Sequence, residues 1–361
     1  MPRHALLAAI FALLSYPFLH AAETPEAPIG HLATLSPDDP ERMEMVRVQI
    51  LLDRANFRPG KIDGLGGEFT QKAADRYCTA YALQPGARLD TTSIPQPYRT
   101  YTVTQDDLMW IGPTATKPQD QVKLKRLPYA DTWEELAEKF HCDLNFIQIL
   151  NPSFKEAPKV GETVRVPDVE PFAVQSVVEL ARQRRMQKRT GAAATVSPSA
   201  TGSPLAGAPS ASPIAAATPT STPAPEPKRR LVLLRAPRII ELYENDKLAG
   251  CFPCTPGSKQ FPVPPGKYRI LSNTLMPEFR WDKSVLETGK RSDTAYELPP
   301  GPNNPVGIVW LALNIPSRGM HGTPNPDQIG RNESHGCIRL ANWDAWVLAQ
   351  RIKAGTPVEV Q

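Results

Sequence analysis

The first regular pattern of apolar positions runs through residues 41–90 and has helical spacing. Two runs show it, and the glycine-rich stretch FRPGKIDGLGGEFT separates them. The apolar positions are Val46, Val48, Leu51, Leu52 and Ala55 in the first run and Ala73, Ala74, Tyr77 and Tyr81 in the second. Because this spacing gathers apolar side chains on one face of a helix, the pattern predicts a small all-α domain built as a helical hairpin.

Residues 127–168 show shorter helical and strand-like runs of apolar positions. The segment TWEELAEKFHCD places its apolar residues on one helical face, LNFIQILNP supplies a second short helix, and VGETVRVP alternates like a strand. We expect a strand, two helices and a closing strand, which is a βααβ unit of the α+β class.

The pattern changes again over residues 229–361. Strand-like runs follow one another with turn residues between them: LVLLRAP, RIIELYEND, KLAGCFPC, GKYRIL and VGIVWLAL. One convincing helix, NWDAWVLAQRIKAG, comes near the end, with Asn342 as its expected N-cap. These features predict a mainly-β domain with one C-terminal helix.

Two segments lack a folding pattern. Residues 191–227 contain no aromatic residue and only Glu226 as a charge, so we expect a disordered Pro/Ala/Ser/Thr linker that leaves the last domain mobile relative to the front half. A basic stretch, residues 182–189, precedes this linker in a predicted helix with a solvated face.

The N-terminus has the layout of an export signal. Arg3 and His4 precede the apolar run 5–19, and the small residues Ala21 and Ala22 end it. The run is interrupted by Pro17 and is shorter than the roughly 20 residues of a membrane span. We therefore expect residues 1–22 to be a cleaved signal peptide, and the mature chain to have no stable membrane span and to work in the periplasm or cell wall.

Charge and cysteine content narrow the classes of function. Among 361 residues, 41 Lys and Arg balance 37 Asp and Glu, so the net charge of +4 does not predict nucleic-acid binding. The five cysteines are an odd number, so at least one stays outside any disulfide within the chain; they are Cys78, Cys142, Cys251, Cys254 and Cys337. The CxxC pair is expected on a strand, where residues three apart point to opposite faces, which does not favour a metal or redox role.

The stretch MHGTPNPDQIGRNESHGCIRL, residues 320–340, holds the candidate chemistry. It places Cys337 near His321 and His335, and a nucleophilic thiol needs a neighbouring base and backbone N–H groups aimed at the oxyanion. Arg339 lies two residues beyond the cysteine, so on an extended segment it shares that face and can pair with a substrate carboxylate. Zinc binding is not expected, because the motif offers at most three N or S ligands and Glu333 as its nearby carboxylate. We predict no cofactor.

Both front units resemble wall-binding modules. VQILLDRANFRPGKIDGLGGEFTQKAADRY resembles the peptidoglycan-binding domain type, and the match is carried by Gln49, Pro59, Gly60, Asp63, Gly64, Thr70 and Ala73. Residues 127–168 resemble a LysM module through Tyr129, Asp131, Thr132, the LAEKF run, Asn151, Pro152 and the VRVP strand. This resemblance implies glycan binding by Asp131, Thr132 and Asn151, although Ala130 stands where such modules usually have glycine.

Residues 229–361 resemble the YkuD-type catalytic domain of L,D-transpeptidases. The motifs are TPG at 255–257, PPGKYRI at 264–270, PPGPNNPVG at 299–307, HGT at 321–323, IG at 329–330 and SHGCIRL at 334–340. The resemblance implies that Cys337 is the nucleophile and that His321 is the base, oriented by the carbonyl of Gly322. His335 and Gly336 would shape the turn that presents the oxyanion donors. Substrate contacts would come from Arg339, Ser334 and Trp281, with Trp310 as a further groove-lining aromatic.

The predicted function is therefore an exported, cysteine-dependent L,D-transpeptidase of cell-wall biogenesis. Its cysteine is acylated by a stem tetrapeptide with release of D-alanine, and an amine takes the acyl group in a 3–3 crosslink. Three alternatives remain open: an L,D-carboxypeptidase, an enzyme that attaches an envelope protein to the wall, and a non-catalytic peptidoglycan anchor. The expected partners are peptidoglycan stem peptides and glycan strands.

Overall fold

The computed structural model describes most of the chain. The described residues are 29–194, 226–257, 262–288, 291–331 and 336–361. The predicted export signal, most of the predicted linker, and the site candidates Ser334 and His335 lie outside the described residues.

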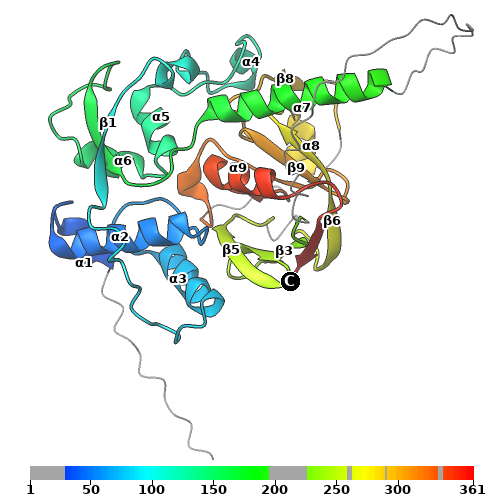
Figure 1. The fold of residues 1–361 in the computed structure, drawn as a ribbon. Helices are drawn as coiled ribbons and strands as arrows, with labels where there is room; N and C mark the ends of the chain where they lie inside the picture. The colour runs from blue at the N-terminus through cyan, green and yellow to red at the C-terminus, as the bar shows by residue number, and fades with distance from the viewer. Residues whose placement is uncertain (1–28, 195–225, 258–261, 289–290, 332–335) are drawn as a thin grey trace, which may run out of the picture.

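The front of the chain contains the two expected helices. The short α1 (Ile29–Thr34) precedes α2 (Pro40–Arg54), and α3 (Glu68–Ala80) follows the glycine-rich turn. Asp39 caps α2, since its carboxylate accepts a hydrogen bond from the backbone N–H of Glu41 at 2.9 Å. These helices begin the molecule on the side away from α7 (Figure 1).

A βααβ unit follows, but its first strand is not where the sequence pattern indicated. Strand β1 is Tyr98–Thr102, about 30 residues ahead of the helices, and it pairs antiparallel with β2 (Thr163–Pro167). Between β1 and the helices α5 (Thr132–Lys139) and α6 (Leu144–Ile149) run the short η1 (Asp107–Trp110) and α4 (Pro118–Gln121). The expectation of a strand near residue 127 was therefore wrong, because the long insertion hid the connection between YRTYT and its partner.

Helix α7 (Val174–Ala194) contains the predicted basic stretch. It begins on the core of the C-terminal domain, where Val174, Val177 and Ala181 are buried with the strands. The helix reaches Ala194, so the first four residues of the predicted linker 191–227 are helical and the linker expectation was wrong for them. None of the helices within the described ranges has the length and apolar character that a membrane span requires.

The C-terminal domain is built on one curled sheet of eight strands, in the order β11-β10-β9-β6-β12-β3-β4-β5. The strands are β3 (Arg229–Leu234), β4 (Ile239–Glu244), β5 (Lys247–Pro253), β6 (Gly266–Leu275), β9 (Val309–Leu313), β10 (Gly319–His321), β11 (Ile338–Arg339) and β12 (Pro357–Val360). A separate two-stranded sheet pairs β7 (Phe279–Trp281) with β8 (Tyr296–Leu298). This mainly-β fold agrees with the sequence pattern.

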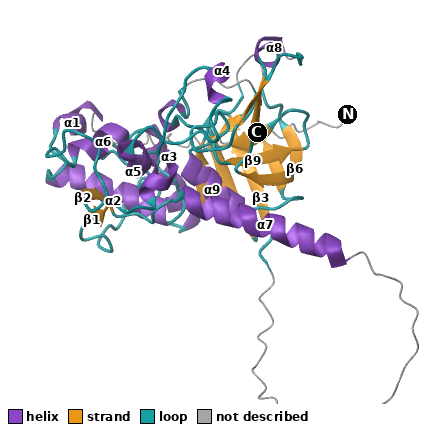
Figure 2. Ribbon diagram, turned by 90° about the horizontal axis from the view of Figure 1, so that it is seen from above, coloured by secondary structure: helices purple, strands orange, loops and turns teal. Residues whose placement is uncertain are grey.

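Helix α9 (Asn342–Arg351) is the predicted C-terminal helix, and it lies against the sheet. Two short additions were not predicted, namely α8 (Lys283–Thr288) and η2 (Pro326–Gln328). Asn342 is the first residue of α9 and not its N-cap, which is Ala341. Viewed from above, the front helices lie on one side of the sheet and α7 runs along it (Figure 2).

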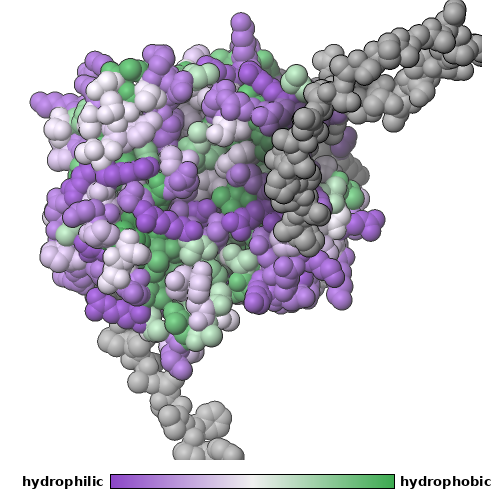
Figure 3. Space-filling view, in the orientation of Figure 1, coloured by the Kyte–Doolittle hydropathy of each residue, from purple (hydrophilic) through white to green (hydrophobic). Residues whose placement is uncertain are grey.

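The front half packs directly onto the C-terminal domain, which contradicts the expectation of two independently mobile halves. Residues 56–58 pair with the outer strand β5, since Arg58 N donates to Cys251 O at 2.8 Å and Cys251 N donates to Asn56 O at 3.0 Å. This pairing covers the edge of the sheet, which otherwise presents unpaired backbone groups. Hydrophilic side chains cover most of the face in Figure 3, with smaller hydrophobic patches between them.

A buried charge cluster joins three parts of the chain at this junction. Arg58 pairs with Asp53 of α2 at 2.6 Å and with Asp344 of α9 at 3.5 Å. His141, at the end of α5, contacts the Asp53 carboxylate at 3.0 Å, and its ring stacks on Trp343 with 5.4 Å between ring centroids. All these side chains are buried, so each fixes the position of the others.

The carboxyl groups of this cluster differ in protonation. Burial raises the pKa of Asp53, but the neighbouring Arg58 and His141 outweigh this and hold it below its usual range. Burial raises the pKa of Asp344 to about 8, against the opposing effect of Arg58. Asp53 therefore neutralises the guanidinium, while Asp344 is mostly protonated at neutral pH.

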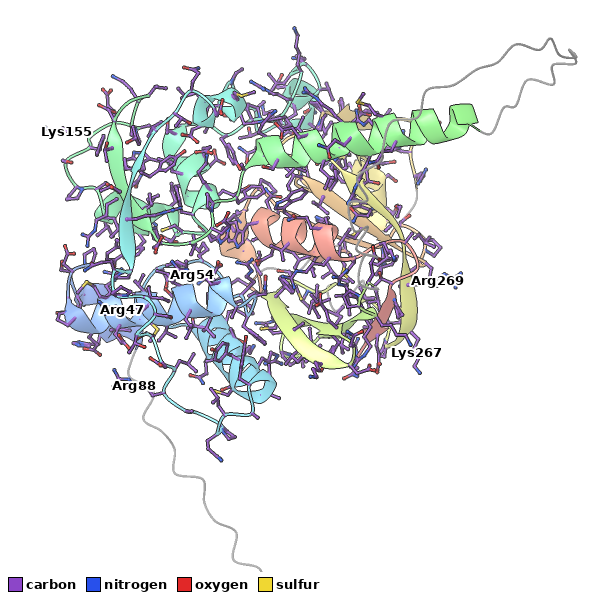
Figure 4. The ribbon with its side chains drawn as sticks, viewed as in Figure 1. Arg47, Arg54, Arg88, Lys155, Lys267 and Arg269 are labelled. Atoms are coloured by element: carbon purple, nitrogen blue, oxygen red, sulfur yellow. The ribbon has the colours of Figure 1, made fainter. Side chains whose placement is uncertain are left out.

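Further contacts hold the βααβ unit in place. Arg54, labelled in Figure 4, extends from α2 to the end of β2, where its guanidinium donates to the Asp168 carbonyl at 2.7 Å. Leu127 N donates to Pro300 O at 3.0 Å, and Asn303 N donates to Leu127 O at 3.1 Å. The helical front, the βααβ unit and the sheet thus form one packed body within the described residues.

Protonation of Asp344 predicts a pH dependence of stability. Its pKa is about 8 when folded and 3.8 in its ordinary state, so the folded chain binds the extra proton between these values. The free energy of unfolding should therefore fall as pH rises from about 4 to about 8. As the pH rises from 5 to 9, the melting temperature of Asp344→Asn, measured by calorimetry, should fall less than that of wild type.

The matched control is Glu156→Gln, which changes an exposed glutamate. It should keep the wild-type pH dependence. Equal losses of stability in wild type and Asp344→Asn would contradict this account of the junction.

Candidate active site

Three neighbouring strands form the floor of the candidate site. β10 pairs with β9 so that His321 lies beside Trp310, and it pairs in parallel with β11 so that His321 lies beside Arg339. Side chains of directly paired residues project from the same face of a sheet. On the opposite face Met320 and Ile338 are fully buried in the core, so the register aims His321, Trp310 and Arg339 away from the core together.

Cys337 immediately precedes β11, and the alternation of side chains along an extended segment puts it on the same side as Arg339. Its Sγ lies 3.8 Å from the carbonyl oxygen of Ser317, which accepts from the thiol. Burial raises the pKa of Cys337, while the N–H of Gly319 and the charges of Arg318 and Arg339 oppose the rise. The group is therefore a thiol at neutral pH, and it needs a base to become a nucleophile.

His321 has the properties of such a base. Its Nδ1 lies 2.6 Å from the carbonyl oxygen of Gly322, to which it donates, so Nε2 carries the free lone pair. Burial, together with the smaller effect of the Arg339 charge, lowers the pKa of His321 to about 4, although the hydrogen bond to Gly322 acts in the opposite direction. The imidazole is thus neutral and ready to accept a proton at neutral pH.

Trp310 completes the surroundings of the base. Its ring stacks on His321 with 5.4 Å between centroids and an interplanar angle of 15°. The stack covers one face of the imidazole and contributes to the burial that lowers its pKa. Sequence reasoning named Trp310 only as a groove-lining aromatic and missed this contact, because the pairing of β9 with β10 cannot be read from the spacing of the two residues.

Gly336 forms the turn before the cysteine. Its φ is +98°, and a Cβ at this position would lie 2.4 Å from Cζ of Arg318. The backbone conformation therefore favours glycine, and the guanidinium of Arg318 packs closely over it. Arg318 was missed by sequence reasoning, because it lies in the turn just before β10 and only the folded chain brings it against Gly336.

Arg339 is held by backbone bonds to the TPG motif. Its N–H donates to Thr255 O at 2.9 Å, and Thr255 N donates back to Arg339 O at 2.9 Å. Burial lowers the pKa of the Arg339 guanidinium, and the neighbouring Cys337 opposes this. The two motifs, far apart in sequence, thus fix the strand that carries the cysteine.

The remaining candidates lie elsewhere. Trp281 belongs to the small sheet β7–β8, where its ring lies 6.0 Å from that of Tyr296. Asp131 is exposed and caps α5 by accepting from Glu134 N at 3.0 Å, while Thr132 is buried at the start of that helix. Asn151 is buried, and its amide bonds Ile147 and Arg165 within the βααβ unit, which gives it a structural role.

The other four cysteines lie in buried surroundings. Cys78, Cys142, Cys251 and Cys254 are buried and form no disulfide in the described part of the chain. Burial raises the pKa of Cys142, Cys251 and Cys254, which keeps them as thiols. Among the described residues, no three His, Cys, Asp or Glu side chains are grouped so that they could hold a metal ion.

The stack on His321 predicts a measurable change in its pKa. In Trp310→Ala water reaches the ring, so the pKa of His321 should rise from about 4 toward its ordinary 6.5. The matched variant Trp310→Phe keeps an aromatic ring and should shift it less. The pKa of His321 can be measured by NMR titration, with the His321→Gln variant used to assign its signal. An unchanged pKa in Trp310→Ala would show that the Trp310 ring does not affect the pKa of His321.

Comparison with known proteins agrees with this geometry. The family model of the YkuD L,D-transpeptidase catalytic domain matches residues 227–360. A putative L,D-transpeptidase YkuD from Bacillus licheniformis is 34% identical over 123 residues, covering 34% of this chain and 59% of that protein. The putative L,D-transpeptidase YkuD from Bacillus subtilis is 44% identical over 102 residues, covering 28% of this chain and 52% of that protein. The chain thus spans little more than half the length of these relatives.

Solved structures of L,D-transpeptidases also match part of the chain. L,D-transpeptidase 3 from Mycobacterium tuberculosis is 22% identical and covers 37% of this chain and 61% of its own, with a TM-score of 0.31. The L,D-transpeptidase from Mycobacterium smegmatis is 19% identical, covers 37% and 59%, and has the same TM-score of 0.31. The assignment rests on the family model and the curated relatives: residues 227–360 carry a YkuD-type L,D-transpeptidase catalytic domain.

Proposed function

We propose that this chain is an exported L,D-transpeptidase that uses Cys337 as its nucleophile in cell-wall biogenesis. One observation carries the proposal: a buried, neutral His321, oriented by Gly322, is paired across the sheet with Arg339, which lies two residues beyond Cys337. A neutral thiol beside a neutral imidazole is the arrangement of general-base nucleophilic catalysis.

The proposed reaction begins with a stem tetrapeptide. The thiol sulfur attacks the carbonyl carbon between diaminopimelate and the terminal D-alanine while the thiol proton moves to Nε2 of His321. Backbone N–H groups of the turn at residues 336–337 stabilise the oxyanion. The C–N bond then breaks, His321 returns the proton to the leaving amine of D-alanine, and a thioester remains on Cys337.

An acceptor amine completes the cycle. Its nitrogen attacks the thioester carbonyl, His321 takes the proton from the amine and passes it to the departing sulfur, and a new amide bond forms. A diaminopimelate amine yields the 3–3 crosslink, water yields a carboxypeptidase product, and a protein lysine yields wall attachment. Ser334, His335 and Trp281 are proposed to shape the groove around these substrates.

Charge favours a stem peptide as donor. The guanidinium groups of Arg318 and Arg339 both flank Cys337 closely enough to affect its pKa. A stem tetrapeptide carries one carboxylate on D-alanine, close to the scissile bond, and another at the end of the diaminopimelate side chain. A guanidinium group binds a carboxylate through two parallel hydrogen bonds. We assign Arg318 and Arg339 to the recognition of these carboxylates.

The front modules are proposed to contact the wall as well. Their resemblance to peptidoglycan-binding and LysM modules supports this, and so does the exposure of Asp131 in the loop before α5. Asn151 and Thr132 are buried, so glycan contacts in this unit would come from Asp131 and the exposed loop after α6.

The nucleophile is tested by intact-mass measurement after incubation with a carbapenem. The full chain should gain one covalent adduct, while Cys337→Ala gains none and keeps its binding to purified peptidoglycan. Failure of the wild-type chain to gain the adduct, or persistence of the adduct in Cys337→Ala, would overturn the assignment.

The role of Arg318 is tested with the donor peptide. Loss of a hydrogen bond to a charged group costs about 1.5–3 kcal/mol, so Arg318→Gln should lower kcat/KM for the tetrapeptide by about 10- to 100-fold. Arg318→Lys keeps the positive charge but cannot form two parallel hydrogen bonds, so its kcat/KM should lie between those of wild type and Arg318→Gln. With a donor whose D-alanine carboxylate is replaced by an amide, the difference in kcat/KM between wild type and Arg318→Gln should become much smaller. If this difference stays the same, Arg318 does not recognise that carboxylate.

A further inference from the structure

The side chain of Asn342 lies behind the catalytic base. It is fully buried at the start of α9, and its Oδ1 accepts from Ile308 N at 3.3 Å. A Cβ on Gly322 would lie 2.1 Å from this oxygen. The amide of Asn342 therefore packs directly against the residue whose carbonyl orients His321.

The other end of the same amide is held by the βααβ unit. Asn342 Nδ2 donates to Glu138 Oε1 at 2.9 Å, and the same oxygen accepts from the hydroxyl of Tyr129 at 2.8 Å. Nδ2 also donates to Pro302 O at 3.2 Å. Glu138 and Tyr129 are buried, so these bonds form away from competing water.

These contacts connect the βααβ unit with His321 in the C-terminal domain. Glu138 belongs to α5, Asn342 to α9, and Gly322 follows β10 directly. Each member is buried and closely packed, so a shift of Glu138 moves the amide and with it the peptide at Gly322. An unpartnered Asn342 N–H in this interior would also be costly.

We propose that Glu138 is a positioning residue for His321, acting through Asn342 and Gly322, so that the βααβ unit completes the active site and does more than tether it. The contacts from Glu138 to Gly322 are observed in the structure. An effect of Glu138 on acyl transfer rests on the function proposed above. The orientation of the imidazole in this chain then depends on a module that lies outside residues 227–360.

The proposal is tested in the full chain with Glu138→Ala, Glu138→Asp and Glu138→Gln. Gln keeps the acceptor oxygen and should rescue the function, while Asp keeps the carboxyl group but does not reach Asn342. The matched control is Glu135→Ala, which removes another buried carboxylate from α5 whose partner is Lys139. Calorimetry fixes the folded fraction of each variant, and rates are compared per folded molecule.

The main readout is the rate of Cys337 alkylation by iodoacetamide against pH. At pH 7 the Ala and Asp variants should react about 10-fold more slowly, because a misplaced imidazole no longer takes the thiol proton. At a pH above the thiol pKa the rates should converge, since the thiolate then forms without a base. Glu138→Gln and Glu135→Ala should stay within about twofold of wild type throughout.

Two results would overturn the proposal: wild-type rates in both Glu138→Ala and Glu138→Asp, or an equal loss in Glu135→Ala. Carbapenem acylation of the same samples separates this proposal from the proposed function. If wild type is alkylated in the expected pattern but never acylated, the positioning role stands and the transpeptidase assignment fails. If wild type is acylated and the variants match it in both assays, the positioning role fails alone.

Discussion

The structure depends most on the buried guanidinium of Arg58. An arginine stays charged in a protein interior, so burying it is tolerated only where carboxylates surround it closely. The ionised Asp53 at 2.6 Å meets this requirement, and the protonated Asp344 lies at 3.5 Å on the other side. These two residues come from α2 and α9, which lie far apart in the sequence. This one constraint fixes the front helices against the C-terminal helix, and it places Asn342, two residues before Asp344, behind the catalytic base.

The chemistry of the site follows from burial in a comparable way. Burial raises the pKa of Cys337 and lowers that of His321 to about 4, so both groups are neutral before substrate arrives. A preformed thiolate-imidazolium pair is thereby disfavoured, and in the proposed reaction the proton moves as the sulfur attacks. Arg318 and Arg339 place positive charge beside Cys337, which suits the carboxylate-bearing donor of the proposed reaction.

Motifs confined to one stretch of chain could be predicted from the sequence, and contacts between distant stretches could not. The pattern of residues 229–361 predicted the mainly-β domain, and the motif around His321 and Cys337 indicated the candidate reactive segment. Strand β1 was missed because η1 and α4 separate it from its unit, and Asn342 was assigned to a helix cap because Glu138 is 204 residues away. The packing of the front half on the sheet was missed for the same reason, since it depends on Arg58 meeting Asp344.

The most direct test of the central claim is muropeptide analysis after incubation of the full chain with purified peptidoglycan rich in tetrapeptide stems. The account predicts release of D-alanine and the appearance of dimers joined between two diaminopimelate residues, with neither product formed by Cys337→Ala. Tripeptides without dimers would replace the transpeptidase assignment with a carboxypeptidase. An unchanged muropeptide profile with folded wild-type protein would contradict the account of the site.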